Sequence, residues 1–224
     1  MILKAIIESL PMSVGVAVSP LPLAVIVMIL LTAKVRTNAP SFLLGWILGL
    51  LMVGGIVFMI PVSQSEGGKP IAAAGYLRMG LGVLLLYFGV RQWRRRPRPD
   101  EVVETPKFLA GLDHFTAGKS LLIGFLLVAI HPKNLTLCAA GAAAIDLHTL
   151  NLVQQFVSYG VFTMIASSSI AIPMIPYFFW RERAKAFFEG WKDWLFRNNQ
   201  TILAVILVIF GGLILARGVG MVAK

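Results

Sequence analysis

The chain has 224 residues, of which 58% are hydrophobic and 13% are charged, with a formal net charge of +10 and a mean hydropathy of +0.82. Most of such a chain cannot form the water-facing surface of a soluble domain, so we expect an all-α polytopic membrane protein. The basic residues flank hydrophobic segments, which excludes nucleic acid as the expected partner, and a single cysteine, Cys138, excludes an internal disulfide framework or a CxxC redox pair.

Six segments are long and apolar enough to be transmembrane helices, because a hydrocarbon core about 30 Å thick needs about 20 residues of helix. They cover roughly 9–33, 41–62, 71–90, 120–145, 152–178 and 201–219. The first lacks a small-residue cleavage pattern and is longer than a signal-peptide core, so we expect it to be retained. The second contains GWILG at 45–49, a GxxxG pattern that predicts close helix packing.

The lysines and arginines are distributed unequally between the connections. Fourteen of the 20 fall in the connections after the first, third and fifth segments, whereas four fall on the opposite side. The positive-inside rule assigns the basic connections to the cytoplasm. We therefore expect a multi-pass protein of the plasma (inner) membrane with both termini extracytoplasmic.

A basic linker at 91–119, which begins RQWRRRPRPDE, divides the chain into halves at 1–90 and 120–224. Aligning the halves at an offset of 112 residues places AVSP, at 17–20, on AIHP, at 129–132. Because three crossings reverse the direction of the chain, the second half would be inserted upside down relative to the first. The sequence thus predicts two inverted three-helix repeats, each with a broken first helix.

Two stretches outside the apolar segments have aromatic residues at helical spacing opposite charged ones. They are PKFLAGLDHF, at 106–115 in the linker, and a segment at about 181–197. Such patterning favours helices that lie in the cytoplasmic interface and contact anionic lipid headgroups. The alternative is a plain solvated connection.

Prolines near the middle of the first segment of each half predict helix breaks. Pro132 removes a backbone donor, and Pro20 and Pro22 do the same in the first half. The carbonyls freed in this way are tolerated at membrane depth only where protein groups or a water-lined cavity satisfy them. Paired broken helices indicate a substrate site near the bilayer midplane, formed here by SPLP, with Ser19, and HPKN, with His131.

The polar residues after Pro132 define the chemistry expected of this site. An ammonium near the bilayer centre costs about 2.5–3.5 kcal/mol on insertion scales, so Lys133 should face protein or water. Beside the positive end of a half-helix it would favour a carboxylate, sulfate or phosphate headgroup. Asn134 is expected to cap that half-helix. His131, with a reference pKa of about 6.5, is a candidate for a proton-coupled step, or else a neutral cap for the freed carbonyls.

Other polar residues carry weaker predictions. Arg78, in the third segment, either snorkels to the outer surface or serves an extracellular exit. Asp146 and His148 are expected in a loop at the outer end of the fourth segment. No metal cluster, cofactor motif or nucleophile motif is apparent, since the three histidines lie in different environments, so we expect neither a metal nor a cofactor and no enzyme.

Four segments carry a resemblance to a known family. They are VSPLPL at 18–23, FLLGWILGL at 42–50, GVLLLYFGVRQWRRRPRP at 82–99 and HPKNLTLCAAGAA at 131–143. In this order, over nearly the whole chain, they resemble the peptidoglycolipid-addressing proteins, which include the sulfolipid-addressing proteins of mycobacteria and belong to the lysine-exporter superfamily. Members typically have Asn-Pro-Lys-Asn, so Pro132, Lys133 and Asn134 match the family whereas His131 replaces an asparagine.

The resemblance implies a six-helix membrane protein of an actinobacterium that is involved in moving cell-envelope glycolipids outward. Our first hypothesis is an exporter of an amphiphilic, anionic lipid, driven by an ion or proton gradient, with the headgroup at Lys133. The second is an exporter of amino acids or other small solutes, the broader activity of the superfamily. The third is a non-transporting accessory to lipid-synthesis or export machinery. The sequence leaves a monomer and a homodimer both open.

Overall fold

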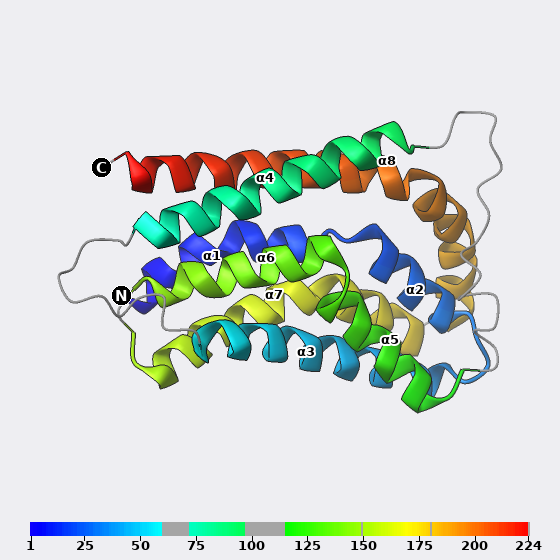
Figure 1. The fold of residues 1–224 in the computed structure, drawn as a ribbon. Coiled ribbons are helices and arrows are strands. Elements are labelled where there is room, and N and C mark those ends of the chain that lie inside the picture. The colour runs from blue at the N-terminus through cyan, green and yellow to red at the C-terminus, as the bar shows by residue number, and fades with distance from the viewer. Residues whose placement is uncertain (60–71, 97–114, 149, 180, 224) are drawn as a thin grey trace.

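The computed structural model describes residues 1–59, 72–96, 115–148, 150–179 and 181–223. Within these ranges all the regular secondary structure is helical, and Figure 1 shows an elongated bundle with both termini at one end. The helices in chain order are α1 Ile2–Ala17, α2 Pro20–Leu30, α3 Val35–Met59, α4 Ala72–Arg94, α5 Ala117–Ala129, α6 Pro132–Asp146, α7 Leu152–Phe179 and α8 Arg181–Val222.

Three helices are long and apolar enough to cross a membrane on their own: α3, α7 and the Arg197–Val222 part of α8. The bent pairs α1–α2 and α5–α6 raise this number to five if each pair is one span. The expectation of an all-helical, multi-pass membrane protein is confirmed at this level. Helix α4 covers the predicted span 71–90 and lies alongside α8 (Figure 1), but it is not among the five.

The predicted breaks in the first helix of each half are confirmed. The chain bends by 54° between α1 and α2 and by 65° between α5 and α6. Ser19 and His131 have extended backbone and precede Pro20 and Pro132, which open the new helices. Proline disfavours helical geometry in the residue before it and loses no hydrogen bond as the first residue of a helix. Pro22 lies in the first turn of α2, where a backbone donor has no helical partner.

Small residues let α3 and α5 pack closely, as the GxxxG pattern predicted. A Cβ on Gly45 would meet the backbone carbonyl of Leu121, and one on Gly124 would meet the carbonyl of Phe42. Nearby, Tyr159 of α7 is buried and donates its hydroxyl hydrogen to the carbonyl of Leu50 at 3.0 Å. These contacts hold both α5 and α7 against α3.

The segment at about 181–197 is helical and continuous with the last span in α8, and its position in the membrane interface stays a prediction. Figure 1 shows the first turns of α8 crossing the end of the bundle before the helix turns along its length. Phe188 is buried here, whereas Phe187, Trp191 and Trp194 are exposed. Of PKFLAGLDHF, residues 106–114 lie outside the described residues, and Phe115 is buried instead of facing lipid headgroups.

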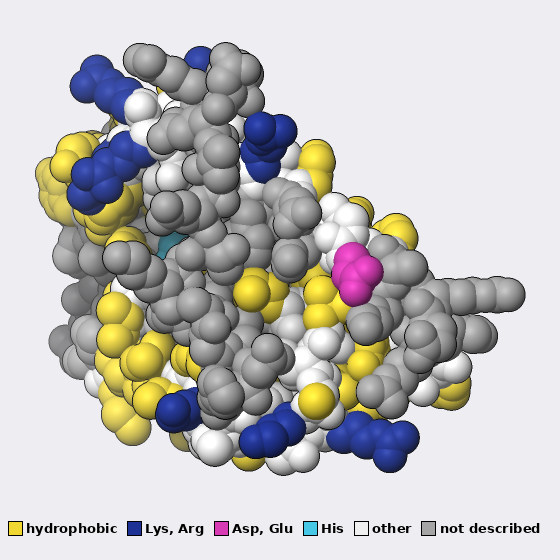
Figure 2. All heavy atoms as spheres, turned by 90° about the vertical axis from the view of Figure 1, so that its right-hand side faces the viewer, with side chains coloured by type: hydrophobic (Ala, Val, Ile, Leu, Met, Phe, Trp, Pro, Cys, Tyr) yellow, Lys and Arg dark blue, Asp and Glu magenta, His cyan; other side chains and the backbone are white. Residues whose placement is uncertain are grey.

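Basic side chains gather at the end of the bundle that faces away from the termini. Figure 2 looks onto this end and shows lysine and arginine side chains around its rim. The end of α2, the start of α3 and the end of α4 all lie at this end, so it carries basic residues from the first and third connections of the sequence. We refer to it below as the basic end.

The close packing of α3 on α5 predicts a stability effect at Gly45. We expect Gly45→Ala to lower the thermal unfolding midpoint of the detergent-purified protein by several degrees, because the added methyl group meets the backbone of Leu121. Overpacking of this kind typically costs about 1–3 kcal/mol. Gly55→Ala, on the same helix with open space around it, is the control and should be neutral. Equal midpoints for the two variants would contradict the packing described.

Candidate functional site

The two helix breaks lie against each other and are joined by hydrogen bonds. The Ser19 hydroxyl donates to Oδ1 of Asn134 at 3.2 Å, and Nζ of Lys133 donates to the carbonyl oxygen of Val18 at 3.0 Å. Each bond links residues 115 positions apart, one from each half. The structure thus brings SPLP and HPKN together, as the sequence predicted.

Asn134 acts differently from the helix cap that the sequence predicted. The residue that caps α6 is His131, because Pro132 occupies the first helical position and so fixes the start of the helix. Asn134 is fully buried in the first turn, where its Nδ2 donates to the carbonyl of Leu127 at 2.8 Å. Its side chain therefore connects α6 to the end of α5 and, through Ser19, to α2.

Lys133 faces protein rather than lipid, with only 1% of its surface exposed. Its ammonium donates to the carbonyl of Val18, the residue directly after α1, at the negative end of that helix dipole. No carboxylate pairs with it among the residues that the structure describes. Because an ammonium has three donors and the contact with Val18 uses one, Lys133 keeps donors for a further anionic or polar partner.

A cavity of about 180 Å³ lies beside Lys133, between α4, α8 and the start of α6. Its lining combines three cations with an amide, an imidazole and apolar side chains. These residues are Arg91, Arg95, Lys133, Gln92, His131, Pro132, Phe88, Leu203 and Leu207. Because Arg91 and Arg95 are exposed while Lys133 is buried, the cavity leads from the basic end of the bundle towards the helix breaks.

Sequence reasoning missed the three polar residues that α4 and its end contribute to this lining, Arg91, Gln92 and Arg95, and the three apolar ones, Phe88, Leu203 and Leu207. It used the RQWRRR run only to assign topology. The signal was the helical spacing of Arg91 and Arg95, since residues at i and i+4 share one face of a helix. Arg94 does not line this cavity, and the guanidinium of Arg96 lies 4.0 Å from the ring centre of Trp93.

His131 supplies its backbone carbonyl to α6, where it accepts from the amide of Leu135 at 3.0 Å. Its imidazole makes no capping hydrogen bond, and its Nδ1 is buried without a partner among the described residues. The role of a neutral cap for freed carbonyls is therefore not what the geometry shows. The ring instead lines the cavity, where a bound molecule or water could reach it.

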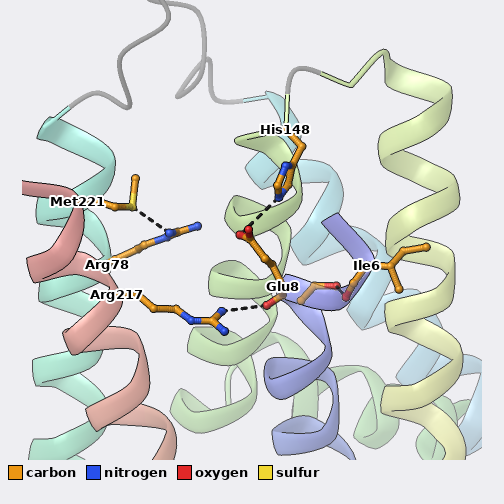
Figure 3. Close-up of polar contacts among 7 residues, drawn as sticks. Ile6, Glu8, Arg78, His148, Arg217 and Met221 are labelled. Carbon is orange, nitrogen blue, oxygen red and sulfur yellow. Dashed lines mark hydrogen bonds and ion pairs between the residues drawn. The ribbon is translucent and has the colours of Figure 1, made fainter. Parts of the chain in front are cut away.

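Arg78 lies away from the helix breaks, near the start of α4, and points towards Glu8 with Arg217 beside it (Figure 3). The loop expectation for Asp146 was wrong, because Asp146 is the last residue of α6 and is buried. It accepts a hydrogen bond from Nε2 of Gln155 at 2.9 Å, which joins the ends of α6 and α7. His148 lies in the turn after α6, as expected.

The fold and the site define a class: a polytopic helical membrane protein whose two proline-broken helices share a buried polar centre beside a cationic cavity. A comparison with protein families matches residues 10–220 to the family described as Sap, sulfolipid-1-addressing protein. The chain belongs to this family, which confirms the resemblance found in the sequence. Comparisons with curated proteins and with solved structures gave no match. Membership of the lysine-exporter superfamily stays a prediction.

The buried bonds of Asn134 predict a large loss of stability on truncation. Asn134→Ala leaves the carbonyl of Leu127 and the hydroxyl of Ser19 without their partner, at a cost of about 1–3 kcal/mol. Thermal unfolding should show this as a lowered midpoint. Asn198→Ala is the matched control, because its amide makes a single exposed bond to the carbonyl of Trp194. A midpoint for Asn134→Ala as high as that of the control would contradict the bridging role.

Proposed function

We propose that the protein is a membrane transporter that moves an acidic, amphiphilic cell-envelope glycolipid outward, without chemical change. The observation that carries the proposal is the cavity beside the helix breaks, which combines the cations Arg91, Arg95 and Lys133 with an apolar wall. Such a lining suits an oxyanion attached to hydrocarbon. The family description, which names a sulfolipid, supports the same substrate class.

The transporter would have six spans arranged as two inverted three-helix repeats. Helix pairs α1–α2 and α5–α6 run in opposite directions along the bundle (Figure 1), and both are bent at a proline. The helix contacts also correspond when α1–α4 are matched in order to α5–α8. The contact of α3 with α5 corresponds to that of α7 with α1, and the contact of α2 with α8 corresponds to that of α6 with α4. This correspondence supports the repeat.

The lipid tails would leave the cavity sideways along α4 and α8. The apolar part of the lining, Phe88, Leu203 and Leu207, belongs to these two helices. Their outer surface beside it is also apolar and exposed; its residues are Val83, Leu84, Tyr87, Val90, Val205, Val208 and Ile209. A headgroup held at Lys133 could therefore remain attached to tails in the bilayer.

Orientation and energy supply complete the proposal. The basic end would face the cytoplasm and the termini the outside of the plasma membrane, in line with the positive-inside rule. Exposed Trp191 and Trp194, at the start of α8, would lie among anionic headgroups at the cytoplasmic surface.

A proton or ion gradient would drive export, and the imidazole of His131 in the cavity is the group we assign to a proton-coupled step.

The direct test is transbilayer movement of a sulfated glycolipid in proteoliposomes that contain only the purified protein and carry an imposed pH gradient. We expect gradient-dependent movement by the native protein and a loss of about tenfold or more in Arg91→Gln, because a charge-assisted hydrogen bond to the headgroup is removed. Arg94→Gln removes the same charge from the same helix outside the cavity, and it should retain the native rate.

The remaining outcomes separate the other functions. Efflux of an amino acid without movement of any lipid would contradict lipid export and support a small-solute exporter. Absence of any movement until a partner machinery is added would support an accessory role. The molecular mass of the active protein in the membrane would distinguish a monomer from a homodimer.

Lys133→Met should separate function from stability. Lys133 is a buried cation without a carboxylate partner among the described residues, and it is desolvated at a cost that an apolar side chain of similar length avoids. Methionine avoids this cost but leaves the carbonyl of Val18 without its donor, so the two effects oppose each other. We expect the unfolding temperature to stay within a few degrees of the native value while lipid movement is lost. If instead it unfolds at a lower temperature and still moves lipid, the ammonium is a structural cap for α1 and not a headgroup ligand.

A further inference from the structure

A second group of charged side chains lies at the terminal end of the bundle, opposite the basic end (Figure 3). It consists of Glu8 on α1, Arg78 on α4, Arg217 on α8 and His148 after α6. Nη1 of Arg217 donates to the backbone carbonyl of Glu8 at 3.2 Å. The Glu8 carboxylate lies 3.4 Å from Nε2 of His148. Figure 3 shows both guanidinium groups directed from α4 and α8 towards α1.

Arg78 has weaker partners than its burial requires. It is only 9% exposed, and its single hydrogen bond among the described residues is from Nη1 to the thioether sulfur of Met221, at 2.9 Å. A thioether is a weak acceptor, whereas a buried guanidinium is normally paired with a carboxylate or several oxygens. Most N–H donors of Arg78 are therefore unused in the described part of the structure.

Glu8 does not neutralise the two arginines through hydrogen bonds. Its carboxylate is directed to His148, and only its backbone carbonyl contacts Arg217. The carboxylate is also 44% exposed, so water competes with the arginines for it. Both guanidinium groups are thus directed towards α1, and no carboxylate oxygen among the residues described forms a hydrogen bond or ion pair with either of them.

We propose that Arg78 and Arg217 form a second anion-binding site, which takes the acidic headgroup (a sulfate ester, phosphate or carboxylate) of the amphiphile that enters through the Lys133 cavity. The planar fork of a guanidinium matches the oxygens of such groups. Arg78 and Arg91 are thirteen residues apart on α4, which places the two sites about 20 Å apart along one helix. That the lipid moves from Lys133 to the arginine pair rests on the proposed function. That the arginine pair binds an anionic headgroup does not.

The alternative is that both arginines only hold the helix ends in place by snorkelling to the surface. A lysine would serve that purpose equally well, since it carries the same charge on a long apolar stem. It would lack the fork that binds an oxyanion with two donors. Arg78→Lys therefore distinguishes a binding site from an anchor.

The test is native mass spectrometry of the full chain with galactosylceramide 3-sulfate, which counts bound molecules, with uncharged galactosylceramide as the reference lipid. We expect two sulfated molecules on the native protein and one on Arg78→Gln, Arg78→Lys or Arg217→Gln, with affinity for the lost site weakened about tenfold or more. Lys4→Gln, which removes an exposed cation at the same end, should still bind two. Inorganic sulfate is added as a competitor. If it displaces the second lipid molecule, the site binds free anions as well as headgroups.

Retention of two bound molecules by all three arginine variants would overturn the proposal, as would loss of binding in Gln variants with full binding in Arg78→Lys. If the arginine variants lose one bound lipid while Lys133→Met still binds two, the site at Arg78 and Arg217 is supported. The same result would show that Lys133 does not bind a headgroup, which would contradict the proposed function. If Arg78→Gln fails to fold, the half-buried Arg217→Gln and the charge-conserving Arg78→Lys still decide the question.

Discussion

The structure depends on one constraint: backbone carbonyls that are freed where a helix breaks inside a membrane must find donors within the protein. Each break frees such groups, and side chains from the second half satisfy them. Lys133 donates to Val18 at the end of α1, and Asn134 donates to Leu127 near the end of α5. Asn134 also accepts from Ser19, so the same two residues close both breaks and lock them together.

This arrangement explains why a charge can reside at the centre of an apolar bundle. Lys133 is desolvated, and the end of the α1 dipole compensates only part of its charge. The residual charge faces a cavity that leads to Arg91 and Arg95 at the basic end, and the arginine pair at Arg78 and Arg217 lies near the other end. An anion could therefore meet cations at successive depths of the bundle, with apolar helix faces beside them for a hydrocarbon tail.

The helix breaks, their pairing and the family could be predicted from the sequence, because proline acts locally and Pro20 and Pro132 occupy equivalent positions. The cap position was missed by three residues, since a proline at the first helical position fixes the start of α6 before Asn134. The role of Arg91 and Arg95 depends on which helices pack together, which composition does not reveal. The continuity of α8 through its aromatic segment was likewise hidden, because amphipathic and apolar patterns can share one helix.

The central claim, that the joined helix breaks bind the headgroup, is tested most directly by photo-crosslinking. A sulfated glycolipid with a diazirine beside the headgroup would be activated on the protein in nanodiscs, and the labelled residues mapped by mass spectrometry. The account predicts label on residues 131–134 and on the cavity face of α4, and its loss in Lys133→Met. Label confined to the outer apolar faces of the helices, unchanged in Lys133→Met, would contradict it.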